Sequence, residues 1–299
     1  MIVGAGLAGL IAANAFPKME VFEIAPEPRE SHKALLRFRS DDVSHLTNIP
    51  FKAVKVHKGI WYNPKGGWVA PSIETANLYS NKVLGKLLPR SIWNLEPVTR
   101  YIAPDDFYDQ LVDKAGARLH WDFRVDFNKC ANMNAPTIST TPLNVTTKEL
   151  GIDHGIDFRR SGITVQRFRI PDCDVYQTVY FPTPNHSLYR ASITGDILIL
   201  EFVTSPQGTF MMDVIEAFAL KGGLPMEELG EVQQRYGKIA PINEDKRKAL
   251  VGHLSTDHNI YSLGRFATWR NLLLDDVVQD IAVIKRLMNG DGYARRLAQ

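Results

Sequence analysis

The sequence has few cysteines, no long apolar run and little excess charge of either sign. Its 299 residues include two cysteines, Cys130 and Cys173, which are too few for a disulfide framework or a zinc site of several cysteines. We therefore expect a reducing, cytoplasmic setting. No apolar run reaches the roughly 18 residues that a membrane span needs, so no membrane partner is expected. The formal net charge of +2 gives no electrostatic reason to expect a nucleic-acid partner.

What the chain does contain is typical of a globular protein. Hydrophobic residues make up 44% and charged residues 23% of the sequence, and a chain of this length can bury a substantial core. The eight histidines are scattered and have no carboxylates at a metal-ligand spacing, so we expect no metal site. The partner indicated by these properties is a small molecule.

Three glycines near the N-terminus are the most informative feature. Residues 1–9 read Met-Ile-Val-Gly-Ala-Gly-Leu-Ala-Gly, which places Gly4, Gly6 and Gly9 at the G-x-G-x-x-G spacing. Between a strand and a helix, the first glycine permits a tight turn and the second lets the backbone approach a pyrophosphate. The third lets the helix pack closely against the strand. The first N–H groups of the helix then face the phosphates, so the pattern predicts a dinucleotide site.

The residues that follow fit the same unit. We expect a helix over Leu10–Phe16, stopped by Pro17, and a second strand over Met19–Ile24. Glu23 lies close to the offset of about 20 residues at which an acid binds the ribose hydroxyls in such units. The motif does not by itself distinguish NAD from FAD, and it does not reveal the chemistry.

The middle of the chain changes from mixed structure to strands. We expect a helix over Asp105–Ala115, short strands over Arg118–Val125 and Thr137–Thr140, and a loop over Asn128–Pro136. From 162 to 203, alternating apolar residues and turn residues predict strands. We therefore expect an α/β fold in which a dinucleotide-binding domain is interrupted by a strand-rich insertion. The domain is assigned to 1–55, 95–157 and 240–299, and the substrate-binding insertion to 56–94 and 158–239.

A hairpin is the clearest part of this insertion. Gly195-Asp196 is a two-residue turn, and the register it sets pairs Thr194 with Ile197 and Arg190 with Glu201. Two interpretations of Arg190 are open: a buried arginine that faces an active site, or an exposed ion pair worth under about 1 kcal/mol. The sequence favours the exposed pair. The residues expected on the apolar face are Tyr189, Ala191, Ile193, Leu198, Leu200 and Phe202.

The C-terminal part predicts a short strand at 261–263 that ends in Gly264 and Arg265, followed by a helix with Asp275 as its N-cap. Two interpretations are open here as well. The strand and helix either bring Gly264-Arg265 and a positive helix end to a ligand, or simply close the core. The apolar residues at helical spacing are Val277, Ile281, Ile284 and Met288.

Three stretches together resemble a known group of proteins. They are Gly4-Ala-Gly-Leu-Ala-Gly9 with Glu23, Ile138-Ser-Thr-Thr-Pro142 and Gly264-Arg-Phe-Ala-Thr-Trp269. They look like the glutathione-reductase-type flavoprotein superfamily, in the branch that contains UDP-galactopyranose mutase, protoporphyrinogen oxidase and the flavin amine oxidases. Compact phage-encoded FAD/NAD(P)-binding proteins have a similar appearance. The resemblance implies a Rossmann-type FAD-binding domain with a parallel sheet, and FAD as the cofactor.

The resemblance also implies roles for individual residues. Gly4, Gly6 and Gly9 would hold the FAD pyrophosphate and Glu23 the adenosine ribose. Val125 would lie beside the adenine, with Thr140 or Thr141 near the adenosine half. Gly264 and Arg265 would pass close to the flavin and the pyrophosphate. The helix that begins near Asp276 and Val277 would point its positive end at the flavin, where a reduced flavin carries negative charge.

The chain departs from that branch after Glu23, where an arginine followed by a paired-glycine segment is usual. Here residues 29–40 contain no glycine pair, so the loop beside the flavin must be built differently. Arg37 and Arg39 either contact a phosphate or an anionic substrate, or form a solvated edge. No His or Cys attachment motif for the flavin is recognisable, so the FAD is expected to be non-covalent.

Three functions remain open. The preferred one is an FAD-dependent oxidoreductase in which a small amine-bearing or nucleotide-linked substrate transfers a hydride to flavin N5. The second is a mutase-like flavoenzyme that acts on a nucleotide sugar without net redox change. The third is an FAD-binding protein without catalysis. The residues named as candidates for the substrate are Arg37, Arg39, Tyr180, Arg190 and Trp269.

Overall fold

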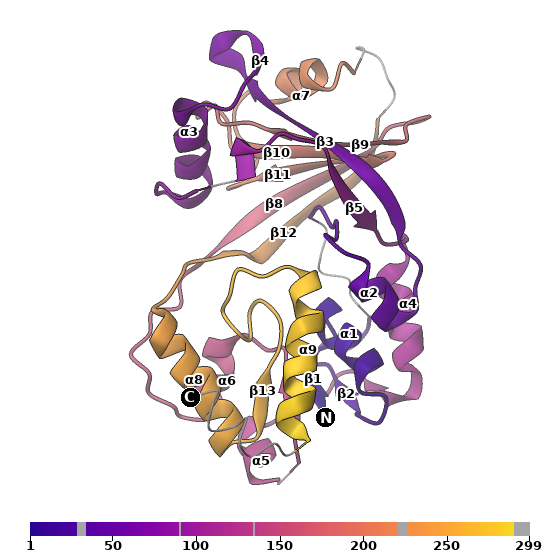
Figure 1. Cartoon of the computed structure of the whole chain (residues 1–299), viewed down its shortest axis with the longest axis vertical. Coiled ribbons are helices and arrows are strands. Elements are labelled where there is room, and N and C mark those ends of the chain that lie inside the picture. Colours follow the sequence, from indigo (N-terminus) through magenta and orange to yellow (C-terminus); the bar gives the residue numbers. More distant parts are fainter. Residues whose placement is uncertain (29–33, 90, 134, 221–225, 290–299) are drawn as a thin grey trace.

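The computed structural model describes residues 1–28, 34–89, 91–133, 135–220 and 226–289. Two sheets stand one above the other, and helices cover both (Figure 1). The smaller sheet is parallel, and the larger one is mostly antiparallel. This confirms the predicted α/β fold, with a parallel sheet and a strand-rich second part. Among the described residues, no helix is long and apolar enough to cross a membrane.

The smaller sheet has five strands in the order β13-β7-β1-β2-β6. Ile2 of the central strand pairs with Val21 on one side and with Ile138 on the other. The chain therefore leaves β1 toward β2 and later returns on the opposite side. The space beyond the carboxyl ends of β1 and β7 is then the switch point at which open α/β sheets bind ligands. The strands are β1 (Ile2–Val3), β2 (Val21–Phe22), β6 (Leu119–His120), β7 (Thr137–Ser139) and β13 (Ile260–Ser262).

Helices cover both faces of this sheet because alternate strand residues point in opposite directions. Ile2 packs into one core with α1, α2, α4 and α9, whereas Val3 packs into another with α5, α6 and α8. The first group comprises α1 (Leu7–Ala15), α2 (Asp42–Thr47), α4 (Phe107–Ala115) and α9 (Leu274–Met288). The second comprises α5 (Phe127–Asn132), α6 (Leu143–Glu149) and α8 (Glu244–Asp257).

The larger sheet runs in the order β12-β8-β11-β10-β9-β3-β4, and β5 pairs with β3. One face packs against α7 (Met211–Ala217) and the other against α3 (Ile73–Leu84). Its strands are β3 (Lys52–Tyr62), β4 (Gly67–Val69), β5 (Val98–Ile102), β8 (Arg160–Arg169), β9 (Val175–Tyr180), β10 (Leu188–Gly195), β11 (Ile197–Phe202) and β12 (Glu227–Ile239). Single 3-10 turns occur at Asn63–Lys65, Ser91–Trp93 and Gly116–Arg118.

Two predicted elements differ from the structure. The first helix begins at Leu7, directly after Gly6, and not at Leu10. The loop expected over 128–136 is wrong in its first part, where α5 is found. The Asp126 carboxylate accepts hydrogen bonds from the backbone N–H groups of Asn128 and Lys129 and so starts this helix. The helix expected over 105–115 and the strands between 162 and 203 are confirmed.

The hairpin has the predicted register, with Thr194 opposite Ile197 and Arg190 opposite Glu201. The expected position of Tyr189 is wrong. The pairing is irregular between Leu188 and Arg190, and this bulge turns Tyr189 away from the face that holds Ala191 and Ile193. Tyr189 therefore packs on the α3 side of the sheet.

The predicted domain boundaries stay a prediction. Strands of the smaller sheet fall within 1–55, 95–157 and 240–299, and most strands of the larger sheet fall within the assigned insertion. β5 lies within 95–157 and pairs with the first half of β3, with Lys52 opposite Ile102. The larger sheet therefore contains residues from both the predicted dinucleotide-binding domain and the predicted insertion.

Candidate functional site

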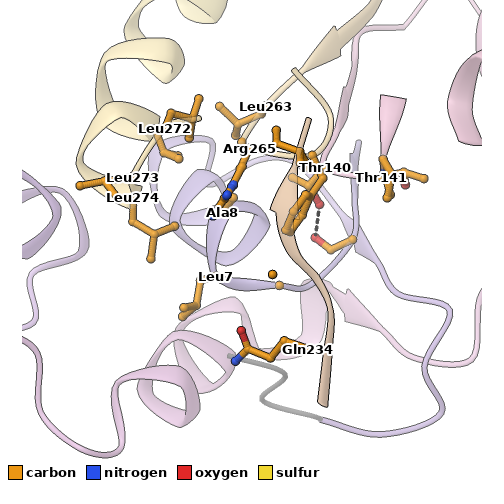
Figure 2. Close-up of a pocket in the computed structure, with 18 of the residues that line it drawn as sticks. Leu7, Ala8, Thr140, Thr141, Gln234, Leu263, Arg265, Leu272, Leu273 and Leu274 are labelled. Atoms are coloured by element: carbon orange, nitrogen blue, oxygen red, sulfur yellow. Dashed lines mark hydrogen bonds between the residues drawn. The ribbon is translucent and has the colours of Figure 1, made fainter. Parts of the chain in front are cut away.

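A large cavity of about 1100 Å³ lies between the two sheets. Drug-sized ligands occupy sites of about 300–1,000 Å³, so there is room for a long ligand. One end is formed by the turn after β1 and by the exits of β2, β7 and β13. The other end is formed by the inner face of the larger sheet and the last residues of α3. Figure 2 shows residues of the cavity wall: Leu7, Ala8, Thr140 and Arg265 from the first end, and Gln234 from the larger sheet.

The turn after β1 depends on two glycines for its own shape. Gly4 has a φ of +98°, which L side chains rarely adopt, and a Cβ there would overlap the Thr140 hydroxyl. A Cβ at Gly9 would overlap the carbonyl oxygen of Gly4. The Thr140 hydroxyl donates to the carbonyl oxygen of Val3 at 2.9 Å and so ties the exit of β7 to this turn. These glycines bring the start of α1 close to the strand.

Gly6 differs from these two glycines. It is the N-cap of α1 and lines the cavity, and a Cβ added there would meet no protein atom within 4 Å. The protein fold therefore does not require glycine at this position. The open space beside Gly6 is a cradle in which a ligand can approach the backbone.

The start of α1 is suited to an anion. The first N–H groups of a helix have no partner inside the helix, and the helix dipole makes this end positive. The first turn of α1 contains no acidic residue, and the Gly6 N-cap supplies no side-chain acceptor. Leu7 and Ala8 line the cavity, so this positive end faces it.

Glu23 lies at the carboxyl end of β2, on the wall of the same cavity. One carboxylate oxygen accepts a hydrogen bond from the backbone N–H of Ala5 at 2.6 Å, and the other accepts from Ala25 at 3.0 Å. These bonds hold the carboxylate beside the glycine turn. A carboxylate has about four lone-pair sites, so it retains capacity to accept from a ligand hydroxyl.

Arg265 supplies a positive charge on the opposite wall. It follows Gly264, whose φ is +87° and at which a Cβ would lie 3.0 Å from the Cβ of Ala8 at the start of α1. One Arg265 guanidinium nitrogen donates to Asn271 Oδ1 at 3.1 Å. Its Nε is buried and has no hydrogen-bond partner among the residues that the structure describes. Burial lowers the pKa of Arg265. An anion in the cavity would stabilise this charge.

The predicted cofactor residues are brought together, with two exceptions. Gly9 packs against the carbonyl of Gly4, and Asp276 lies at the start of α9; neither residue is on the cavity wall. The residues that line the cavity are Gly4, Gly6, Glu23, Val125, Thr140, Thr141, Gly264, Arg265 and Val277.

Arg37 lines the cavity, but protein acceptors occupy its guanidinium. It donates to the hydroxyls of Thr194 and Thr178 at 3.0 and 2.9 Å and to the carbonyl oxygens of Gln177 and Ile193 at 3.2 and 2.6 Å. Burial lowers its pKa to about 10. Arg37 therefore ties the segment after residue 33 to β9 and β10.

Arg39 also has protein partners and does not line the cavity. Its guanidinium lies 2.5 Å from the Asp276 carboxylate, and its backbone N–H donates to Asp275 Oδ1 at 2.8 Å. The expectation that Asp275 caps α9 is wrong, because Asp275 accepts from the Arg39 and Ser40 backbone. The cap is supplied by Asp276, whose side chain accepts from the N–H of Leu273 at 2.7 Å.

The interpretation of Arg190 as an exposed ion pair is wrong. Its partner Glu201 is only 1% exposed, and both residues line the cavity. Glu201 accepts two hydrogen bonds from the Arg190 guanidinium and one from the Tyr189 hydroxyl at 3.3 Å. The pair lies on the face opposite Ala191 and Leu200, as strand alternation predicts, but that face packs against α3 and lines the cavity instead of facing solvent.

The last two candidate residues are buried and are not on the cavity wall. Tyr180 stacks edge-on against Tyr79 in the core beneath α3. Trp269 packs against Phe158, and its indole N–H donates to the carbonyl oxygen of Ala240 at 3.0 Å.

Several lining residues were not singled out from the sequence. At the end beyond Glu23 the wall includes Phe22 and Phe123, whose ring centroids are 4.8 Å apart. At the other end Lys238 lines the cavity, with its Nζ 4.4 Å from the centroid of the Tyr189 ring. An irregular pairing of β12 between Gln234 and Lys238 positions this part of the wall, and no local pattern signals it. Among the described residues, no group of three or more His, Cys, Asp and Glu could hold a metal ion.

Comparisons with known proteins show which fold this is. No family model and no curated protein matches the sequence. Solved structures do match. Reduced UDP-galactopyranose mutase is 14% identical with a TM-score of 0.62, over 96% of this chain and 93% of that one. An oxidoreductase from Methanosarcina mazei is 10% identical with a TM-score of 0.55, over 95% of this chain and 99% of that one.

A third structure, a triple mutant of the flavin-dependent brominase Bmp2, is 11% identical with a TM-score of 0.53. The match covers 99% of this chain and 83% of that one. The chain therefore has a fold that flavin-dependent enzymes adopt. At these identities the likeness extends to the fold alone, and the chemistry has to be inferred from the residues of the cavity.

Proposed function

We propose that this chain is a flavoprotein that binds FAD non-covalently and oxidises a small substrate. The observation that carries the proposal is the single cavity that joins the glycine turn to the inner face of the larger sheet. A dinucleotide cofactor and a substrate need such adjoining spaces, because the reacting atoms must meet inside the protein.

The residues of the cavity fit FAD. The pyrophosphate would lie at the open cradle of Gly6, where the first N–H groups of α1, which have no partner inside the helix, favour an anion. Glu23 would accept from the ribose hydroxyls, and the wall formed by Phe22, Phe123 and Val125 would receive the adenine. Arg265, whose Nε has no partner among the described residues, would meet negative charge on the pyrophosphate or the flavin.

The cofactor would supply the redox step by accepting a hydride at flavin N5. The chain itself would bind and orient the substrate and exclude water. The apolar wall formed by Leu35, Leu36, Val83 and Leu84 faces the space available to the substrate. The Arg190 charge is already balanced by Glu201, so an anionic or nucleotide-linked substrate would be bound by Lys238, which lines the same end of the cavity. An amine-bearing substrate would suit the same hydride chemistry.

A mutase-like reaction on a nucleotide sugar is the second candidate. The likeness to the mutase structure supports it, because that likeness extends along almost the whole of both chains. In such a reaction the substrate is rearranged without net redox change, so no electron acceptor is consumed.

The test begins with purified protein. We expect visible flavin absorption, and release of FAD when the protein is denatured. The protein is then mixed anaerobically with candidate amines and nucleotide sugars. Bleaching of the oxidised flavin by a substrate supports the oxidoreductase, whereas turnover that needs reduced flavin and consumes no acceptor supports the mutase. A colourless protein that cannot be reconstituted with FAD would contradict both.

A further inference from the structure

A polar cluster with two buried members lies outside the cavity and is not used by the proposed chemistry. It consists of Lys82 in the last turn of α3, His186 in the connection between β9 and β10, and Asp213 in α7. The His186 side chain is 0% exposed and that of Asp213 is 3% exposed. Since α3 and α7 pack on opposite faces of the larger sheet, the cluster joins three elements that are distant in sequence.

Three acceptors surround the Lys82 amine. Its Nζ lies 3.0 Å from the carbonyl oxygen of Phe181, 2.6 Å from that of Thr183 and 3.5 Å from Nδ1 of His186. An ammonium group has three N–H donors and no acceptor, so these three groups match its full capacity. His186 Nδ1 must then accept, and the imidazole proton is left on Nε2.

The charges of the cluster balance. His186 Nε2 lies 3.3 Å from Asp213 Oδ2, and the other Asp213 oxygen accepts from the Asn63 amide at 2.5 Å. Below about pH 7, where the Lys82 amine is protonated, a neutral imidazole therefore lies between a partly buried ammonium and a buried carboxylate. Burial lowers the pKa of Lys82 to about 7 and that of His186 to about 4, which agrees with a neutral imidazole.

The residues next to Lys82 belong to the cavity. Val83 and Leu84 complete α3 and line the cavity wall, and Ala34 and Leu35 of the wall pack against the same core. The position of α3 therefore determines part of the space that the substrate would occupy.

We propose that Lys82 is a positioning residue, which anchors the last turn of α3 to the β9–β10 connection and to α7 and thereby fixes the Val83–Leu84 wall of the cavity. We call Lys82, His186 and Asp213 the Lys82 anchor. The anchor itself does not depend on a bound cofactor, whereas its bearing on catalysis rests on the proposed function.

The test is amide hydrogen exchange of the full chain, with and without added FAD. Lys82→Met keeps the aliphatic stem and removes the charge. We expect peptides that cover 73–84, 181–187 and 34–38 to exchange at least about tenfold faster than in the unaltered protein, with α1 unchanged. Lys86→Met is the matched control, because Lys86 is an exposed lysine four positions further on, and we expect it to change nothing.

A double-mutant cycle tests whether the anchor acts as a unit. At pH 6 the Lys82 amine is charged, so Lys82→Met and Asp213→Asn each leave the opposite charge of the pair unbalanced, and each should lower the urea midpoint of unfolding. The double variant should lose clearly less than the sum of the two single losses. Additive losses would overturn the proposal, and so would exchange in Lys82→Met that rises uniformly over the chain or leaves 34–38 unchanged. If Lys82→Met does not fold, the isosteric Asp213→Asn alone gives the same exchange test.

The two proposals fail in different ways. A chain that binds no FAD but shows the expected exchange keeps the anchor and loses the proposed function. A chain that binds FAD but shows no coupling between Lys82 and Asp213 loses the anchor alone.

Discussion

Replacing Glu201 by Gln should destabilise the protein far more than an exposed ion pair would. The change keeps the size of the side chain and removes its charge, which leaves the Arg190 guanidinium without its counter-charge. Glu201 is 1% exposed, and one of its oxygens accepts from Arg190 at 2.7 Å. Breaking a buried ion pair by removing one partner costs about 3–5 kcal/mol. The Arg190 side chain is 28% exposed and remains partly hydrated, so we expect about 3 kcal/mol.

The assay is urea unfolding followed by circular dichroism, with a matched control on the same sheet. Glu227 forms an exposed ion pair with Arg169 at 3.2 Å, where the two side chains are 63% and 49% exposed. Glu227→Gln should cost less than about 1 kcal/mol, because solvent screens such pairs. Equal losses for the two variants, or a loss below about 1 kcal/mol for Glu201→Gln, would refute the assignment of a buried pair that lines the cavity.

Three further predictions follow from the same contacts. Gly9→Ala should lower stability by about 2 kcal/mol or more in urea unfolding, because its Cβ overlaps the Gly4 carbonyl; an unchanged midpoint would show that the turn can relax. Arg37→Leu should cost about 3 kcal/mol through its lost bonds to β9 and β10, whereas a variant that is fully stable would favour a role in substrate binding. The pKa of Lys82 is about 7 in the folded protein against 10.5 normally, so only the unfolded chain holds this proton between those values. The unfolding free energy of the unaltered protein, relative to that of Lys82→Met, should therefore rise from pH 7 toward pH 10, by at most about 1.4 kcal/mol per pH unit. A relative value that does not vary with pH would contradict this.

The parts of the fold that local pattern determines could be predicted. Gly9 packs on the carbonyl of Gly4 within a single turn, so this part of the motif is local, and the structure places the turn beside the predicted acid, Glu23. The hairpin register could be predicted for the same reason, since the Gly195 turn determines which residues pair.

The roles of side chains whose partners are distant in the sequence could not be predicted. Arg37 and Arg39 look alike in sequence, but one donates to β9 and β10 and the other pairs with the start of α9. These partners lie more than a hundred residues away, so no local pattern reveals them. The bulge at Tyr189 is also a property of strand pairing, and it reverses the face on which this side chain lies.

The central claim is that the space beside Gly6 holds the pyrophosphate of FAD, and one measurement tests it most directly. Gly6→Val places a Cβ where the protein has no atom within 4 Å, so the variant should fold, with only the small loss of stability that a poorer N-cap brings. Gly252→Val in α8 is the control, because a Cβ there also meets no atom within 4 Å. We expect FAD titration to show binding to the unaltered protein and to Gly252→Val, and none to a folded Gly6→Val. Normal FAD binding by Gly6→Val would contradict the assignment of this turn as the cofactor site.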